Sequence, residues 1–377
     1  MSSTNKTWLP ELEGLRGFAA AWVFLGHICI LVQCDIPILK SPGYGVDLFI
    51  ILSGFLMTKN YIERQSTEPW DNINTIKNFW LRRFFRIAPL YYLLLCFAIY
   101  FGPEIGQMRD VISTFYPNTA TDINRFNDQT IKNTLIHASF VFGLIPEYSF
   151  RTTLPDWSIG LEMQYYLVFP LIMLVSLKSG LKKTLLAISF LATTLYFIFP
   201  TFYKSFPMAS FILLKLPIFI AGMLLYLAVR YNKTYLIILP IIAILFASIT
   251  KLHIDKRQLI LQIAMCVFIF YILRDSEAAT RFNLKEFVKK IFNNKISMWL
   301  GDVSYSVYLI HLLIVTPTIG IALESFDISH LHPIVRFSIV ALISTPIVYL
   351  LANITYNFVE KPGMLFGRKF LIKSNAL

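Results

Sequence analysis

Charged residues are scarce in this sequence: they make up 15% of its 377 residues, whereas hydrophobic residues make up 56%. Ordinary soluble domains carry about 25% charged residues, so the composition excludes them and indicates a polytopic membrane protein. Cysteine is scarce as well, and Cys29, Cys34, Cys96 and Cys266 show neither metal-ligand nor CxxC spacing. Because no HExxH sequence occurs either, we expect no metal site.

Other absences each remove a class of function. No GxxxxGK[ST] sequence occurs, which argues against a nucleotide-driven pump. No GxSxG sequence occurs, so the nucleophile turn of a serine hydrolase is not expected.

The polar start, Met1 to Pro10, does not resemble a cleavable signal peptide. The net charge of +12 collects in a few loops, which indicates membrane topology and then an anionic ligand, rather than nucleic acid.

Hydrophobic segments long enough to cross a membrane run along most of the chain. A spanning helix needs about 20 apolar residues. Candidate spans are about 15–33, 44–60, 84–101, 157–177, 183–200, 209–229, 234–250, 258–273, 297–319 and 334–357. The sequence therefore predicts an all-α membrane helix bundle of about ten transmembrane helices over residues 1–360, with a cytoplasmic tail over residues 361–377.

Loop charges set the predicted orientation, because cytoplasmic loops carry an excess of Lys and Arg. The basic 59–86 and 274–295 loops both fall inside if the shorter apolar stretch 133–146 does not cross. We therefore expect both termini in the cytoplasm and 133–146 to be re-entrant or interfacial. One loop breaks the rule, since Lys251, Lys256 and Arg257 would be external.

Two ionisable residues stand out in the first predicted span, where a plain anchor would carry none. Arg16 opens the span and His27 lies eleven residues later, about 16 Å along a helix and on nearly the same face. Ionisable groups inside a membrane usually face a bundle interior or a wet cavity. His27 is the candidate for acid–base catalysis, because its free pKa lies near neutrality. The alternative is an interhelical hydrogen bond.

A basic cluster introduces the third predicted span from the cytoplasmic side. Arg82, Arg83 and Arg86 fall within little more than one helical turn, so two of them share a face. Guanidinium groups bind phosphate through paired hydrogen bonds, which favours an anionic cytosolic cofactor at this mouth. The alternative is that these residues are ordinary positive-inside anchors.

Carboxylates occur towards the outer ends of two other spans. Asp47 and Glu162 are candidates to orient an imidazole or to receive an acceptor hydroxyl, with helix capping as the alternative. His311 follows Tyr305 and Tyr308 in an aromatic segment, where packing or hydrogen bonding is the simpler role. His137, His253, His330 and His332 fall in or beside outer loops and receive no role.

Six landmarks, taken together and in this order, make the sequence resemble the acyltransferase-3 family of integral membrane acyltransferases. They are ELEGLRG (11–17) followed by His27, GVDLFIILSGF (45–55), RRFFRIAPLY (82–91), WSIGLE (157–162), SYSVYLIH (304–311) and EKP (360–362). The resemblance runs along most of the chain, at these landmarks rather than throughout.

The resemblance implies transfer of an acyl group, usually acetyl from cytosolic acetyl-CoA, to a glycan hydroxyl on the far side of the membrane. It makes His27 the catalytic histidine and Arg16 its signature partner, with Asp47 and Glu162 on the acceptor side. The residues expected to bind acyl-CoA are Arg82, Arg83, Arg86, Ser304, Tyr305 and His311. No metal is implied, and the expected setting is the lipid of the cell inner membrane.

The acceptor implied by a standalone member of this kind is a lipid-linked or surface glycan, and we expect lipopolysaccharide O-antigen. Exopolysaccharide, peptidoglycan, periplasmic glucans and small metabolites remain open, as does the choice between direct transfer and an acyl-histidine relay. A rival class is a proton-coupled transporter, in which the same buried charges form a proton and substrate path.

Overall fold

The computed structural model describes residues 9–249, 255–274 and 284–374, which form helices and the turns between them, with no β-strand among them. Lys251 of the loop that breaks the charge rule lies outside these residues. So do His253, Arg281 of the basic 274–295 loop and the last three residues of the predicted tail.

Eight helices in the described part of the chain are long and apolar enough to cross a membrane, which confirms an all-α membrane bundle. The first seven are α1 (Pro10–Leu31), α2 (Pro42–Glu63), α3 (Ile73–Tyr100), α7 (Trp157–Ser179), α8 (Leu181–Ile198), α12 (Lys256–Leu273) and α15 (Ser304–Phe326). The eighth is continuous from α16 (Pro333–Thr355) through the π-helical segment η7 (Tyr356–Glu360) into α17 (Lys361–Ser374).

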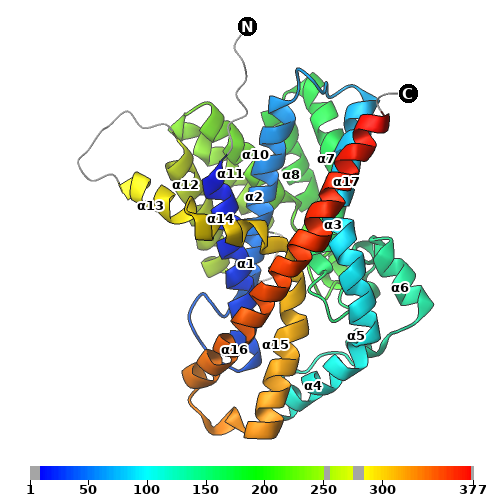
Figure 1. Ribbon diagram of the computed structural model, residues 1–377. Helices are drawn as coiled ribbons and strands as arrows, with labels where there is room; N and C mark the ends of the chain where they lie inside the picture. The colour runs from blue at the N-terminus through cyan, green and yellow to red at the C-terminus, as the bar shows by residue number, and fades with distance from the viewer. Residues whose placement is uncertain (1–8, 250–254, 275–283, 375–377) are drawn as a thin grey trace.

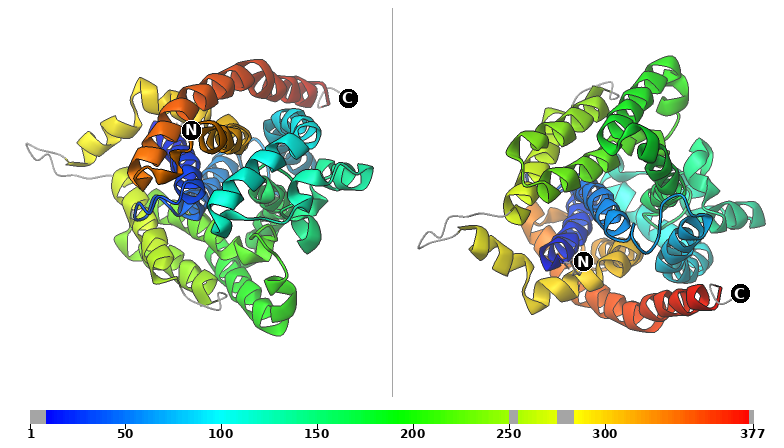
Figure 2. Two further views of the ribbon diagram at one scale, coloured as in Figure 1. Left: turned by 90° about the horizontal axis from the view of Figure 1, so that it is seen from below. Right: turned by 90° about the horizontal axis from the view of Figure 1, so that it is seen from above.

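Two shorter apolar helices match the remaining predicted spans. These are α10 (Leu216–Arg230) and the segment Thr234–Ile249, which comprises η5 (Thr234–Ile237) and α11 (Ile238–Ile249). Figure 2 shows α1 and α2 near the middle of the bundle, with α7 to α12 on one side and α15 to α17 on the other. The cytoplasmic location of the two termini stays a prediction.

The predicted span 297–319 is two helices rather than one. Asn294 caps a short α14 (Lys295–Asp302), accepting hydrogen bonds from two backbone N–H groups, and α15 begins at Ser304. α14 packs across α1 (Figure 1), where a Cβ on Gly17 would lie only 2.6 Å from the backbone of Leu300. A continuous apolar run in the sequence does not reveal such a change of direction. The sequence therefore predicted one helix where the structure has two.

Residues 101–156, which we call the cap segment, contain only short helices. They are α4 (Gly102–Phe115), η1 (Pro117–Thr119), α5 (Asn124–Asn127), α6 (Ile131–Ala138), η2 (Val141–Leu144) and η3 (Pro146–Tyr148). The stretch 133–146 thus forms no helix long enough to span a membrane. The remaining short connectors are α9 (Pro200–Lys204), η4 (Ile212–Leu214), α13 (Leu284–Phe292) and η6 (Ile328–His330).

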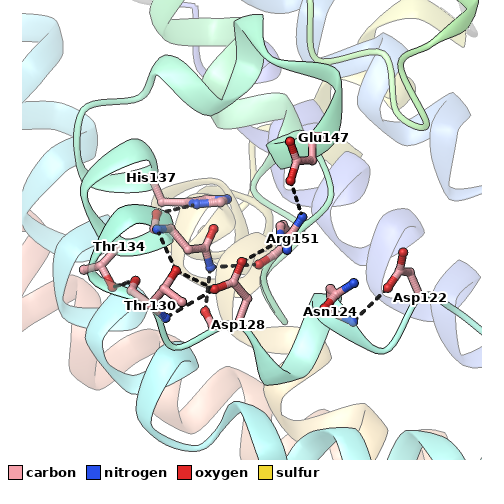
Figure 3. A network of polar contacts seen from close by, with 9 residues as sticks. Asp122, Asn124, Asp128, Thr130, Thr134, His137, Glu147 and Arg151 are labelled. Atoms are coloured by element: carbon pink, nitrogen blue, oxygen red, sulfur yellow. Dashed lines mark hydrogen bonds and ion pairs between the residues drawn. The ribbon is translucent and has the colours of Figure 1, made fainter.

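A polar network gives the cap segment a defined fold (Figure 3). Asp128 accepts hydrogen bonds from the hydroxyl and the backbone N–H of Thr130, at 2.6 and 3.2 Å. It also forms an ion pair with Arg151 at 2.5 Å. Asn133 donates to the backbone carbonyls of Asp128 and Arg151, and the ring of the buried His137 hydrogen-bonds the Asn133 carbonyl at 3.0 Å. Hydrogen bonds of this kind satisfy backbone groups that no regular helix satisfies.

Candidate active site

Two histidines from distant parts of the sequence meet in the bundle. They are His27 of α1 and His311 of α15. Nδ1 of His27 lies 3.1 Å from Nε2 of His311, and the two ring centroids are 4.9 Å apart. His311 is fully buried and His27 is half-buried. The sequence predicted His27 as the acid–base group, but it gave no sign that His311 is its neighbour.

Backbone carbonyls fix which ring nitrogens carry hydrogen. Nδ1 of His27 lies 2.9 Å from the Val23 carbonyl, and Nδ1 of His311 lies 2.6 Å from the Tyr308 carbonyl. Since a carbonyl only accepts, both Nδ1 atoms are protonated, and the neutral His311 accepts through Nε2 from the shared Nδ1–H of His27. No described protein group hydrogen-bonds Nε2 of His27, whose lone pair is therefore available to take a proton.

Next to the histidine pair lies an open cavity of about 60 Å³, which we call the central cavity. Its lining comes from α1, α2, α7, α10 and α15 and includes Arg16, Ser158, Glu162, Tyr305 and Tyr308. Neither histidine is among its lining residues. Tyr308 connects the two features, because it lines the cavity and its ring centroid lies 6.0 Å from that of His311.

Hydrogen bonds hold the aromatic wall of the central cavity in place. The hydroxyl of Tyr308 donates to the Pro155 carbonyl at 2.9 Å and accepts from Ser158 at 2.7 Å. Tyr305 donates to the Ile87 carbonyl at 2.9 Å. The hydroxyl of Ser304 has no hydrogen-bond partner among the described residues, and Ser304 does not line the cavity. Three residues of α15 were predicted to bind the cofactor, namely Ser304, Tyr305 and His311. Among these three, Tyr305 alone lines the central cavity.

A second, more polar cavity of about 180 Å³ is lined by the predicted basic cluster, and we call it the basic cavity. Its arginines are Arg64, Arg82, Arg83, Arg86 and Arg368, against the single acid Glu68. Burial and the positive charges of Arg82, Arg83 and Arg368 lower the pKa of Arg64 against the opposing effect of Glu68. This cavity has the charge to accept a multivalent anion.

Two of the three predicted arginines already have acidic partners. Arg82 makes a two-pronged ion pair with Glu68, at 2.7 Å for each nitrogen. Arg86 contacts the buried Glu360 at 2.6 Å, and Glu360 also accepts from Ser306 at 3.0 Å. Glu360 belongs to the EKP landmark, but no site role was predicted for it from the sequence. Its burial at the end of the π-helical segment follows from helix packing that no sequence motif shows.

Arg83 links the basic cavity to the central cavity. Its guanidinium lies over the rings of Phe79 and Tyr166, 5.5 and 5.4 Å from their centroids. It has no carboxylate partner among the described residues. Tyr166 in turn donates a hydrogen bond to Glu162, which lines the central cavity. A short run of side chains therefore joins the arginines to the cavity beside the histidines.

Asp47 lies in a separate cluster, away from the histidines. Its fully buried carboxylate pairs at 2.6 Å with Lys215, the residue directly before α10. It also accepts hydrogen bonds from Gln258 and Gln262 of α12, the latter at 2.7 Å. These contacts tie α2, α10 and α12 together. The observed partners favour a structural role, and the predicted catalytic role is tested below.

Close helix packing brings Asp47 to its partners. A Cβ on Gly54 would lie 2.1 Å from the Phe219 carbonyl oxygen, and one on Gly222 would lie 2.1 Å from the Ile51 carbonyl oxygen. The absence of side chains at both positions lets α2 and α10 approach closely, as small residues do between membrane helices.

The fold and the site define a polytopic membrane protein in which a histidine pair lies next to one cavity. A run of side chains through Arg83 and Tyr166 links that cavity to a second, strongly basic one. The acyltransferase-3 family model, described as an acyltransferase domain, matches residues 9–353. The chain belongs to this family. No solved structure matches it significantly.

Curated relatives agree with this family. Peptidoglycan O-acetyltransferase OatA of Listeria monocytogenes is 25% identical over 95% of this chain, which spans 56% of that protein. A putative acetyltransferase of Acidianus two-tailed virus is 25% identical over 83% of the chain and 85% of its own length. O-acetyltransferase OatA of Staphylococcus aureus is 30% identical over 44% of the chain and 24% of its own length. The chain thus covers about half, or less, of the two OatA proteins.

Replacing Asp47 with Asn should destabilise the protein, because Lys215 is then left buried without its counter-charge. Breaking a buried ion pair in this way costs about 3–5 kcal/mol, so the unfolding temperature of the detergent-purified protein should fall. The double variant Asp47→Leu, Lys215→Met should recover part of that loss, since it removes both charges. Acyltransferase activity that is lost in this double variant despite recovered stability would support the predicted catalytic role of Asp47 instead.

Proposed function

We propose that this protein transfers an acyl group, acetyl in the simplest case, from cytosolic acyl-CoA to a hydroxyl of an extracytoplasmic glycan at the cell inner membrane. The observation that carries the proposal is the connection between the five-arginine basic cavity and the cavity beside the His27–His311 pair. Membership of the acyltransferase-3 family favours this reaction over proton-coupled transport.

The basic cavity suits the phosphate-rich end of coenzyme A. Arg83 and Arg368 are the two guanidinium groups there that form no ion pair with a described residue, and Arg64 lines the same cavity. Arg82 and Arg86 are held by Glu68 and Glu360, so they contribute charge in fixed positions. The acyl–pantetheine arm then extends past Tyr166 into the central cavity, towards Tyr308 and the histidines.

The acyl group moves by attack of the acceptor oxygen on the thioester carbon. Nε2 of His27 takes the hydroxyl proton, the new C–O bond forms, and the C–S bond breaks to release the CoA thiolate. The proton held by His27 then passes to that thiolate. His311 is a positioning residue, because its Nε2 accepts from Nδ1–H of His27 and keeps the opposite nitrogen facing the acceptor.

The acceptor in this proposal is a lipid-linked or surface glycan, with lipopolysaccharide O-antigen as the specific choice. Arg16 and Glu162 lie together on the lining of the central cavity, and we assign them to the reacting groups. A second acceptor, peptidoglycan, is favoured by the name of the Listeria relative. Both acceptors present sugar hydroxyls outside the cytoplasmic membrane.

Expression of the parent in a Gram-negative host whose O-antigen lacks acetyl groups should add O-acetyl signals to the proton NMR spectrum of the purified polysaccharide. His27→Ala should add none at comparable protein levels, because removal of a general base costs about 100- to 10,000-fold in rate. The peptidoglycan of the same cells, analysed in parallel, identifies the second acceptor. O-acetylation that persists in a folded His27→Ala variant would contradict the proposed chemistry.

His311→Leu should lower kcat about 100-fold with little change in the KM for acetyl-CoA, because the imidazole of His27 loses the partner that orients it. His311→Gln retains an acceptor oxygen and should recover part of kcat. The measurement is the initial rate of acetyl transfer by the purified protein. A change in KM alone would instead fit the predicted role of His311 in cofactor binding.

A further inference from the structure

Two arginines of the cap segment are buried without an acidic partner. Arg109 of α4 and Arg125 of α5 are 9% and 8% exposed, and neither forms an ion pair with any described residue. We propose that Arg109 and Arg125 form a binding subsite for a compact oxyanion, a carboxylate or a phosphate, carried by the acceptor. The identity of the carrier rests on the proposed function, whereas anion binding itself does not.

The hydrogen bonds of these arginines leave donors unused. Arg109 donates to the Thr119 carbonyl, and its Nε is buried with no partner in the described part of the chain. Arg125 donates through Nε to the Thr152 carbonyl at 3.1 Å, and no described group accepts from its two terminal nitrogens. A buried guanidinium has five N–H donors to satisfy, so carbonyl contacts alone do not complete either site.

Electrostatics add to the need for an anion. Burial lowers the pKa of Arg109, and burial together with the charge of Arg109 lowers the pKa of Arg125. The acid that acts on Arg125 is Asp156, whose carboxylate is already engaged by hydrogen bonds from Thr152 and Tyr91 at 2.8 and 3.3 Å. Two neighbouring cations without a close carboxylate are costly to bury, and a bound oxyanion offsets that cost.

Packing contacts hold both arginines in place. The Arg125 guanidinium stacks on the Phe150 ring, 3.7 Å from its centroid. Helix α4 packs directly on α15, where a Cβ on Gly320 would lie 2.8 Å from the Met108 side chain, next to Arg109. Figure 1 shows α4 beside the lower end of α15, and α5 packs against α4.

Contacts made by Tyr308 link the cap segment to the histidine pair. The carbonyl of Pro155, in the cap segment, accepts a hydrogen bond from Tyr308 at 2.9 Å, and the Tyr308 ring centroid lies 6.0 Å from that of His311. Arginine forms paired hydrogen bonds with planar carboxylates and with phosphates. An acceptor anchored there through an acidic group would present its hydroxyl to His27.

Arg151 provides a matched control in the same segment. Its guanidinium pairs with Asp128 at 2.5 Å and with Glu147 at 2.9 Å (Figure 3), so it has no need of an external anion. Arg151→Gln removes the same charge as Arg109→Gln and Arg125→Gln, from a site that already has its counter-ions.

The test is thermal unfolding of the full-length protein in detergent, without acyl donor, at constant ionic strength set by chloride. Glucuronate and inorganic phosphate are the probes, and glucose is the uncharged control for glucuronate. Glucuronate, phosphate or both should raise the unfolding temperature of the parent and of Arg151→Gln by about 3 °C at saturating concentration. The shift should be lost in Arg109→Gln and Arg125→Gln, and glucose should have no effect.

Hydrogen exchange of the parent gives a readout that needs no variant to fold. The bound probe should slow exchange in peptides covering α4 and α5 relative to chloride alone. A parent with neither a thermal shift nor slowed exchange for either probe would overturn the proposal. So would shifts of equal size in Arg109→Gln, Arg125→Gln and Arg151→Gln.

Failure of this proposal is separable from failure of the proposed function. A parent that transfers acetyl groups but binds neither probe overturns the anion subsite alone. A parent that binds a probe through Arg109 and Arg125 but never cleaves acyl-CoA supports the subsite and contradicts the acyltransferase reaction.

Discussion

The contact between the imidazoles of His27 and His311 sets the constraint on which the rest of the site depends. Two imidazole rings whose nitrogens lie 3.1 Å apart in an apolar bundle cannot both carry a positive charge without strong repulsion. The carbonyls of Val23 and Tyr308 direct both Nδ1 atoms, so the neutral pair has one arrangement of hydrogens. That arrangement leaves a single basic nitrogen, Nε2 of His27, for chemistry.

The bundle that contains this pair holds more arginines than acidic partners for them. Five arginines with one acid line the basic cavity, and two further arginines are buried in the cap segment without ion pairs among the described residues. Asp47, by contrast, is fully compensated by Lys215 and two glutamines. We propose that anionic substrates bind at the arginines of these two places that form no ion pair among the described residues, whereas compensated charges hold helices together.

Much of the fold follows from the sequence because hydrophobic runs report burial in lipid directly. The eight long helices and two shorter apolar ones match the ten predicted segments, and 133–146 forms no spanning helix. The division of the predicted span 297–319 into α14 and α15 was not predicted, because both halves are apolar and only their packing on α1 separates them.

The candidate site was predicted less completely, for a reason that lies in helix packing. Spacing within one helix indicates His27 and the Arg82–Arg83–Arg86 cluster, since neighbours three or four residues apart share a face. It does not show which helices are adjacent. Three contacts depend on that adjacency. His27 pairs with His311, 284 residues away, and Arg86 pairs with Glu360. Asp47 pairs with Lys215 rather than facing the histidines.

The central claim is that one path runs through the protein from the basic cavity to an acceptor on the opposite membrane face. The direct measurement uses sealed proteoliposomes with radiolabelled acetyl-CoA enclosed and the acceptor polysaccharide outside only. The account predicts labelled polysaccharide outside with the parent protein and none with His27→Ala. Transfer only when donor and acceptor share a compartment, with intact vesicles, would contradict it.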